Sequence, residues 1–468
     1  MGSFFDEYML CVVAYERSHG LNLCCTESDG EPYSWRGLVA LHRAAHLARM
    51  DPDARVLLTT FSDALANSLR TKLMRLISNE PRLDERLEVH SMDSIGERLY
   101  RANIGPANIA SREVVRRLLE ESADAVEGHR FGLGFLLAEW EQVVDAWQVT
   151  TWEEYRDVRR LGRKTRLPEA RRRVLWEVFS GVRSGLEARG LITRADMFTR
   201  LASHLADARR PPFDFAVVDE AQDVGVGQLR FLSALGGERP NGLFFAGDLG
   251  QRIFQQPFSW RSLGVDIRGR SQTLRVNYRT SHQIRTQADR LLGTEVPDVD
   301  GITELRTGTV SVFNGPTPAI RKLDSTGKEI EAVGAWLSDR IGEGIAEHEI
   351  GVFVRSPIEL GRARAAVEGA GLCFKVLDEK FETVSGHVSI STMHLAKGLE
   401  FRAVAVMACD DEVIPSQARI EQVTDEADLI EVYDTERHLL YVACTRARDH
   451  LLVTSGDSPS EFLDDLRM

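Results

Sequence analysis

The chain has 468 residues, of which 43% are hydrophobic and 28% are charged, enough apolar material for two or three globular domains. This composition excludes a disordered or fibrous protein. No apolar run approaches a length of about 20 residues, which a membrane-spanning helix needs, and the short apolar stretch from Tyr8 to Tyr15 follows acidic rather than basic residues. We therefore expect a cytoplasmic protein with no membrane partner.

The cysteines show neither CxxC spacing nor histidines at zinc-ligand intervals, so we expect free thiols in a reducing compartment. The net charge of -13 argues mildly against a large nucleic-acid footprint, although a narrow basic groove can exist on an acidic surface. One concentration of positive charge predicts either a solvated helical face or a DNA-contacting surface. Its members are Arg156, Arg159, Arg160, Arg163, Lys164, Arg166, Arg171, Arg172 and Arg173.

From Leu38 onward, helical stretches alternate with short β-rich runs, a pattern typical of parallel sheets flanked by helices. Residues 97–208 are almost entirely helical in pattern, and their four tryptophans have a spacing that predicts burial between helices. We expect an α/β fold with a helical insertion in the first α/β domain. The predicted strands are 55–60, 213–218, 242–246, 349–354, 388–392, 403–408 and 450–454.

The sequence DEAQD, residues 219–223, directly follows a predicted buried strand. Ligands of open α/β sheets bind at the carboxyl ends of the strands, where these carboxylates lie. Asp219 is suited to hold Mg²⁺ through its water shell, and Glu220 can orient and deprotonate the water that attacks a γ-phosphate. The alternative is a solvated acidic turn, and the motifs that follow favour the catalytic interpretation.

A second strand ends in GDLGQ, residues 247–251, followed by Phe254 and Trp260. This order resembles the G-D-x-x-Q-x-I-[YF] and W-R motifs of UvrD/Rep-type superfamily 1 DNA helicases. The resemblance implies that Gln251 senses the γ-phosphate, that Asp248 lies on the ATP side, and that both aromatic rings stack on bases of a bound strand. The stretch before Trp260 is longer than in the family, which leaves a core role for that ring open.

Two later motifs imply nucleotide contacts. Residues 274–280, LRVNYRT, resemble the family's L-x-x-N-Y-R-[ST], which implies adenine packing by Tyr278 and a γ-phosphate contact by Arg279. Residues 436–448 resemble E-x-R-x-L-x-Y-V-A-x-T-R-A, which implies that Arg446 is an arginine finger supplied in cis across the domain cleft.

DNA contacts are implied at three places. Residues 392–401, TMHLAKGLEF, resemble T-x-H-x-A-K-G-L-E-F, which implies DNA contact by His394 and a ribose contact by Glu400. Phe61 and His90 match the family's two N-terminal DNA-contacting motifs more loosely, and packing is the alternative role for each.

The resemblance covers roughly residues 38–468 and implies two RecA-like domains with ATP between them and DNA across their top. We expect a first domain at 38–264 with the helical insertion, and a second at 265–468 with a reduced insertion. ATP and Mg²⁺ are the implied cofactors, and single-stranded or partly duplex DNA is the implied partner.

The phosphate-gripping loop of the family is missing from its expected place. A P-loop needs G-x-x-x-x-G-K-[ST], and alignment back from the helix at Leu38 puts GEPYSWRG, residues 30–37, in that slot. Trp35 replaces the second glycine, Arg36 the lysine, and Gly37 the hydroxyl residue. The short sequence Gly327-Lys328-Glu329 does not rescue the motif, because Thr326 and Glu329 fit a capping box instead.

Two explanations remain open for the altered loop. Either the chain is a pseudo-ATPase that retains the other motifs, or residues 1–37 are a displaced start in place of the authentic region, as three of six cysteines in this stretch indicate. The predicted function is an ATP-dependent, 3'-to-5' DNA helicase with impaired activity. The alternative is a non-catalytic DNA-binding or regulatory protein. A nuclease is set aside, because no carboxylate-and-lysine cluster stands outside these motifs.

Overall fold

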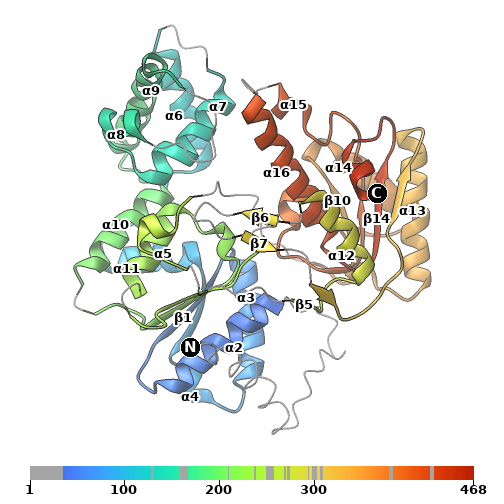
Figure 1. Ribbon diagram of the computed structural model, residues 1–468, viewed down its shortest axis with the longest axis horizontal. Helices are drawn as coiled ribbons and strands as arrows, with labels where there is room; N and C mark the ends of the chain where they lie inside the picture. The colour runs from blue at the N-terminus through green and yellow to red at the C-terminus, as the bar shows by residue number, and fades with distance from the viewer. Residues whose placement is uncertain are drawn as a thin grey trace.

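Two parallel sheets, each with helices on both faces, and a separate group of helices form the molecule (Figure 1). The computed structural model describes residues 35–127, 131–158, 167–208, 210–236, 239–248, 258–267, 270, 275–293, 295–297, 303–305, 309–378, 383–421 and 426–467. Within these residues, no helix combines the length and apolarity needed to cross a membrane.

The first sheet is parallel, with its described strands in the order β2-β1-β3-β4. Strand β1 is buried on both faces, which explains its unbroken apolar and β-branched sequence VLLTT. One apolar core lies between the sheet and α2 to α4, and a second between the sheet and α5, α10 and α11. The strands are β1 (Val56–Thr60), β2 (Leu87–Ser91), β3 (Phe215–Val218) and β4 (Leu243–Phe245).

Hydroxyl residues cap several helices of this half. The Ser62 hydroxyl accepts a hydrogen bond from the Leu65 N–H at 3.3 Å, and Ser91 and Thr193 cap their helices in the same way. The helices are α2 (Trp35–Met50), α3 (Asp63–Leu76), α4 (Pro81–Asp84), α5 (Met92–Asn103), α10 (Arg194–Ala206), α11 (Val226–Gly236), and the 3-10 turns η2 (Ala221–Asp223) and η4 (Arg261–Leu263).

The helical group between α5 and α10 has its own apolar core. Trp140 is fully buried there, and Trp147, Trp152 and Trp176 pack against the same core while partly exposed. The segment predicted to be helical is therefore helical. Its elements are α6 (Arg112–Asp124), α7 (Leu133–Glu139), the π-helix η1 (Trp140–Asp145), α8 (Trp152–Asp157) and α9 (Glu169–Ala188).

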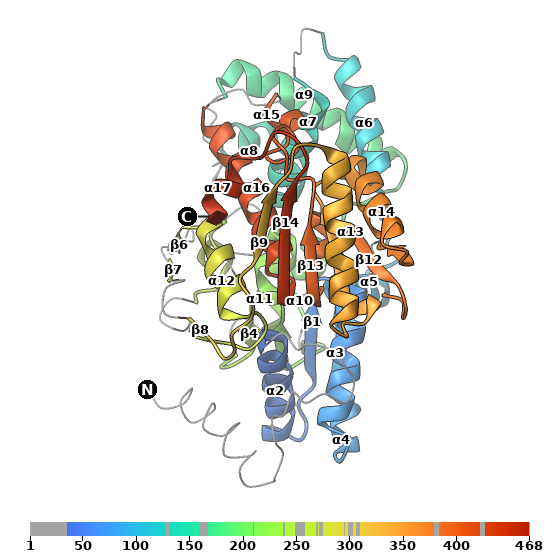
Figure 2. The ribbon, with the colours of Figure 1, turned by 90° about the vertical axis from the view of Figure 1, so that its right-hand side faces the viewer.

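The second sheet is also parallel, with its described strands in the order β11-β12-β10-β13-β14-β9. Figure 2 looks onto this sheet, with α13 and α14 in front of it; α12, α16 and α17 share the core of the other face. The strands are β9 (Ala319–Lys322), β10 (Ile350–Val354), β11 (Phe374–Val376), β12 (Val388–Thr392), β13 (Phe401–Val406) and β14 (Ala447–Ser455).

The remaining elements of this half are short strands and helices. Two small sheets pair β5 with β8 and β6 with β7. The bounds are β5 (Val276–Asn277), β6 (Glu295–Pro297), β7 (Thr303–Leu305), β8 (Val310–Ser311), α12 (His282–Ala288), η5 (Asp289–Leu291), α13 (Thr326–Gly342), η6 (Glu347–Glu349), η7 (Pro357–Glu359), α14 (Leu360–Gly369), η8 (Met393–Ala396), α15 (Gln417–Ile420), α16 (Glu426–Cys444) and α17 (Phe462–Arg467).

The predicted fold class, α/β with two parallel sheets in separate domains and helices inserted in the first, is confirmed. All seven predicted strands occur, with bounds within three residues of the prediction. The domain boundary placed at residue 264 stays a prediction.

The capping box expected at Thr326 and Glu329 is wrong. Ser325 caps α13 by accepting the Lys328 N–H, and the Glu329 side chain is fully buried under the second sheet. There it accepts hydrogen bonds from the Ala408 N–H at 2.9 Å and from a threonine hydroxyl of β14. Because these fixed donors hold the Glu329 carboxylate in the core, it does not turn back to cap the start of α13.

Candidate functional site

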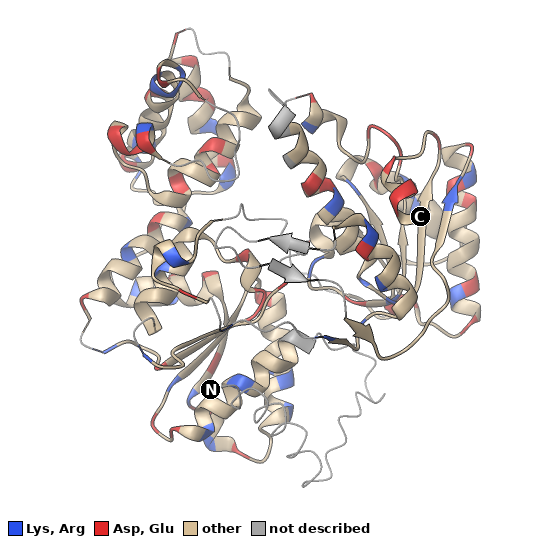
Figure 3. Ribbon diagram, in the orientation of Figure 1, with Lys and Arg blue, Asp and Glu red and all other residues tan. Residues whose placement is uncertain are grey.

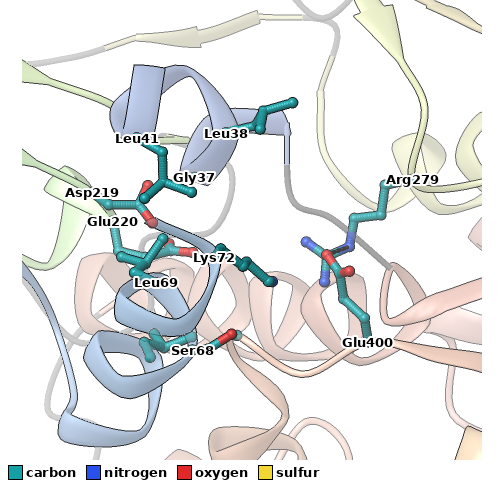
Figure 4. Close-up of a pocket in the computed structure, with 12 residues that line it drawn as sticks. Gly37, Leu38, Leu41, Ser68, Leu69, Lys72, Asp219, Glu220, Arg279 and Glu400 are labelled. Carbon is teal, nitrogen blue, oxygen red and sulfur yellow. Dashed lines mark ion pairs between the residues drawn. The ribbon is translucent and has the colours of Figure 1, made fainter. Parts of the chain in front are cut away.

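A cavity of about 70 Å³ lies between the two sheets and is lined from both sides (Figure 4). The first half supplies the start of α2, one face of α3 and the end of β3, and the second supplies residues that follow β5 and η8. The lining residues are Gly37, Leu38, Leu41, Leu65, Ser68, Leu69, Lys72, Asp219, Glu220, Arg279, Gly398 and Glu400.

The acidic pair lies where the sequence predicted it, at the carboxyl end of β3. The Asp219 N–H donates to the Thr59 carbonyl at 2.8 Å, which continues the sheet and leaves the buried carboxyl at the cavity wall. Glu220 has φ 54° and ψ 42°, which lies in the left-handed region of backbone conformation that residues other than glycine rarely adopt. Such a conformation costs about 1–3 kcal/mol and persists only where surrounding contacts impose it.

Gln222, to which the sequence motifs assigned no role, imposes part of this geometry. Its amide Nε2 donates to Glu220 Oε2, and its Oε1 accepts the Asp248 N–H at 2.9 Å. A Cβ at Gly247 would come within 2.7 Å of the same Oε1, so this close approach requires glycine. The amide thus joins the acidic turn to the neighbouring strand end. Asp248 is buried outside the cavity lining.

Arg279 and Glu400 meet on the opposite wall. Arg279 Nε lies 2.8 Å from Glu400 Oε1, and an Arg279 guanidinium N–H donates to the Leu399 carbonyl at 2.8 Å. Burial raises the pKa of Glu400, while the guanidinium opposes that rise. The two residues that the sequence assigned to a phosphate and to a ribose therefore form one pair.

Arg446 lies behind this pair and not in the cavity lining. It is fully buried, with Nε donating to the Val442 carbonyl at 2.9 Å and a further N–H reaching the Leu399 carbonyl at 3.4 Å. Burial, followed by the positive charge of the nearby Arg279, lowers the pKa of Arg446 to about 9. The Leu399 carbonyl is thus shared by both arginines.

Two features of the cavity wall formed by the first half of the molecule concern the place where the P-loop is expected. Helix α2 begins at Trp35, so residues 35–37 form its first turn, and Gly37 faces the cavity. The side chains of Trp35 and Arg36 lie outside the described structure. Lys72 extends from α3 into the cavity in Figure 4. No motif of the sequence pointed to this lysine, because a single cation on a helix leaves no pattern.

Phe61, a predicted DNA contact, and Trp260, a predicted stacking residue, differ in their surroundings. Phe61 follows β1 directly and is 41% exposed. Trp260 packs edge-on against Phe245, with ring centroids 4.8 Å apart, and joins a core cluster of the first half. Tyr278, the predicted adenine contact, is also 41% exposed. Gln251 and Phe254 lie outside the described residues.

Each of the two predicted DNA-contacting histidines lies beside a glutamate–arginine ion pair. His90 Nε2 lies 3.2 Å from Glu88 Oε2 on β2. His394 in η8 lies with its Nδ1 3.5 Å from an Arg355 guanidinium nitrogen. Burial, followed by the positive charge of Arg355, lowers the pKa of His394 to about 4. His394 is therefore neutral at pH 7.

The described members of the basic cluster make local contacts. Arg156 pairs with Asp157 at 2.8 Å, Arg172 donates to main-chain carbonyls, and Arg173 lies over the Trp152 ring. Figure 3 shows acidic and basic residues interspersed over this helical group. These contacts favour the solvated helical face. Residues 159–166 lie outside the description.

Two parallel-sheet domains that face each other across a cavity lined by both charged and apolar residues define a two-domain, RecA-like class of protein. The model of the UvrD/REP helicase N-terminal domain matches residues 38–263, and that of the UvrD-like helicase C-terminal domain matches residues 372–458. The chain belongs to the UvrD/Rep-type superfamily 1 DNA helicases.

Curated relatives agree with this family. A "Probable DNA helicase" of Mycoplasma pneumoniae is 25% identical over 277 residues, 56% of this chain and 48% of its own. A "Probable DNA helicase II homolog" of Rickettsia conorii is 30% identical over 119 residues, 25% of this chain and 17% of its own. The chain therefore spans half or less of the length of these relatives.

The "ATP-dependent DNA helicase UvrD1" of Mycobacterium tuberculosis is 38% identical over 77 residues, 16% of this chain and 9% of its own. Among solved structures, the C-terminal domain of a possible DNA helicase from Lactobacillus plantarum aligns with 41% of this chain and 94% of its own. Its TM-score is 0.29 and its identity 21%, a similarity that adds nothing to the fold described above.

Proposed function

We propose that this chain is a cytoplasmic, ATP-dependent DNA translocase or helicase that moves 3' to 5' and whose hydrolysis is weakened by the residues at the start of α2. One observation carries the proposal. A single cavity joins Asp219 and Glu220 from one sheet with Arg279 and Glu400 from the other. We divide the chain into domains at residues 38–264 and 265–468, with the helical insertion at about 97–208.

The residues of the cavity fit Mg²⁺ and a triphosphate. Mg²⁺ binds proteins through one or two carboxylates and keeps several waters, so Asp219 suffices, and no larger cluster of His, Cys, Asp and Glu ligands occurs in the described residues. Bound there, the ion would neutralise phosphate charge. Glu220 orients and deprotonates the attacking water, and Arg279 with Arg446 stabilises charge on the transferred group.

The other assigned residues hold the nucleotide and the strand. Tyr278 packs on adenine, Glu400 binds ribose, and Gln251 and Asp248 serve the phosphate side. Single-stranded or partly duplex DNA lies across Phe61, His90, Phe254, Trp260 and His394. The exposure of Phe61 supports its part, whereas the packing of Trp260 against Phe245 also fits a core role.

A second candidate function is a non-catalytic DNA-binding regulator that keeps the helicase scaffold. It is favoured by the first turn of α2, where Gly37 faces the cavity without the hydroxyl that ligates Mg²⁺. Arg36 is no substitute for the compact ammonium of lysine. ATP hydrolysis by the purified chain, with and without single-stranded DNA, separates the two. DNA-stimulated hydrolysis supports the motor, and DNA binding without hydrolysis supports the regulator.

Restoration of the loop tests the cause of the impairment. The combined changes Tyr33→Gly, Trp35→Gly, Arg36→Lys and Gly37→Thr are expected to recover ATP·Mg²⁺ binding, measured by a fluorescent ATP analogue. In that background, Glu220→Gln should lower hydrolysis by about 10²- to 10⁴-fold with binding nearly intact, because only the general base is lost. The exposed Glu85→Gln is the matched control. Weak binding with normal turnover in Glu220→Gln would contradict the assigned role.

A further inference from the structure

A buried ion pair connects the two domains, and the chain neighbour of one member, Gly398, lines the cavity. Lys397 Nζ, which follows η8 in the second domain, lies 2.5 Å from Asp223 Oδ2 at the end of η2 in the first. The two side chains are only 4% and 1% exposed. The proposed function assigns a role to neither residue.

Beside this pair, the backbone of the second domain approaches a side chain of the first closely. Gly398 has φ +79°, and a Cβ placed on it would lie 2.9 Å from a methyl group of Leu65 on α3. Both residues also line the cavity. Glycine therefore lets the segment that carries Lys397 close onto the first domain, and the ion pair forms only in this docked arrangement.

Asp223 is mechanically joined to Glu220 by one turn of 3-10 helix. The Asp223 N–H donates to the Glu220 carbonyl at 3.0 Å, and the side chain of the intervening Gln222 donates to the Glu220 carboxylate. Because Glu220 stands in the unfavourable left-handed region, its position depends on contacts that hold this turn. The ion pair fixes the far end of the turn.

In the docked arrangement each charge of this buried pair depends on its partner. Burial raises the pKa of the Asp223 carboxyl to about 7, and the ammonium of Lys397 opposes that rise. A charge left buried without its partner is strongly unfavourable, whereas both groups are hydrated when the domains separate. Docking of the domains and ordering of the acidic turn are therefore coupled.

We propose that Lys397 is a positioning residue, whose ion pair with Asp223 sets Glu220 for hydrolysis when the second domain docks onto the first. This inference rests on the proposed function, because it assigns a cross-domain control to the same site. It predicts that loss of the pair slows turnover more than it weakens ATP binding.

The test uses the full chain, with the loop-restored form for kinetics. Lys397→Met removes the charge and keeps an unbranched apolar side chain, and Lys397→Arg keeps the charge. Lys322→Ala is the matched control, because it breaks a Lys–Asp pair of equal length inside the second domain. Steady-state hydrolysis with single-stranded DNA, amide hydrogen exchange and thermal melting are measured for each variant.

We expect Lys397→Met to lower kcat by about a hundredfold, as for a misplaced catalytic group. The KM for ATP should change by less than about threefold, because binding contacts remain. Amide hydrogen exchange should rise at residues 219–224 but not in β1. Lys397→Arg should restore at least part of the lost kcat and part of the lost exchange protection. Lys322→Ala should leave kcat and exchange at 219–224 unchanged.

A Lys397→Met variant that melts earlier than the control, yet retains kcat and exchange protection at 219–224, would overturn the proposal and leave a merely structural pair. The exchange experiment needs no activity. If the restored chain hydrolyses no ATP, the proposed motor function fails, while exchange at 219–224 still decides whether Lys397 holds the turn. Asp223→Asn should reproduce the exchange change, and a double variant with Lys397→Met should add little to it.

Discussion

Glu88 in the first domain and Glu436 in the second are both surrounded by cations, but in different environments. Glu88 on β2 lies 2.7 Å from a guanidinium nitrogen of Arg55, 2.5 Å from one of Arg98 and 3.2 Å from His90. Its side chain is 22% exposed. Water therefore screens these pairs, and each contributes little to stability.

Glu436 on α16 is completely buried. Both of its oxygens accept hydrogen bonds from Arg355, at 2.5 and 2.6 Å, and Arg419 adds a third at 2.9 Å. His394 faces this cluster, as His90 faces Glu88. In each domain, a glutamate paired with arginines lies beside a histidine that is a predicted DNA contact. Only in the second domain is this glutamate part of the core.

The largest expected difference is in stability. Glu436→Ala leaves the Arg355 guanidinium buried without its partner, so we expect a loss of about 3–5 kcal/mol in the free energy of unfolding. The matched Glu88→Ala should cost about 1 kcal/mol or less. Urea denaturation of both variants measures this. Equal losses would show that burial does not separate the two clusters.

The two histidines provide the second prediction. Because His394 is neutral at pH 7, its proposed DNA contact is a hydrogen bond without a net charge. We expect His394→Ala to weaken single-strand binding by about tenfold, equivalent to about 1.4 kcal/mol, without changing the slope of log affinity against log salt. Fluorescence anisotropy at salt concentrations from about 50 to about 200 mM measures both the affinity and this slope. A slope reduced by about 1 would mean that a cation was removed.

The smallest expected effect is a pH dependence of the Glu88 cluster. Hydrogen bonding to His90, ahead of the contributions from Arg98 and Arg55, lowers the pKa of Glu88 to about 2 from its ordinary value of 4.5. Its stabilisation is therefore complete above the unfolded pKa and is lost as pH falls from 4.5 toward 2. The stability difference between the wild type and Glu88→Gln, about 1 kcal/mol or less after screening, should vanish across that window. A difference that stays constant would refute the assigned pairing.

The strands of the two large sheets that the sequence missed all lie at a sheet edge, although a fourth edge strand, β4, was predicted from its apolar run. β2, β9 and β11 each lie at the edge of a sheet, where burial is incomplete and polar residues are tolerated. The predicted interior strands are continuous apolar runs, because helices cover both of their faces. Sequence pattern therefore identifies the centre of each sheet better than its edge.

For the candidate site, motif order predicted residues that the fold brings together, among them Asp219, Glu220, Arg279 and Glu400. It did not predict Lys72 or the Lys397 ion pair. Such contacts depend on a single residue meeting a partner far away in the chain, and a single residue leaves no periodic signal. Only the packed arrangement of the two domains reveals them.

The left-handed backbone of Glu220 has a consequence for protein engineering. Glycine adopts this conformation without the steric cost of a Cβ, so Glu220→Gly removes a local strain while it deletes the proposed base. A library of variants screened for heat resistance alone should therefore be enriched in glycine at this position. The selected variants would have higher thermal stability but no hydrolytic activity. Any thermostabilisation of this scaffold has to hold residue 220 constant or screen for turnover in parallel.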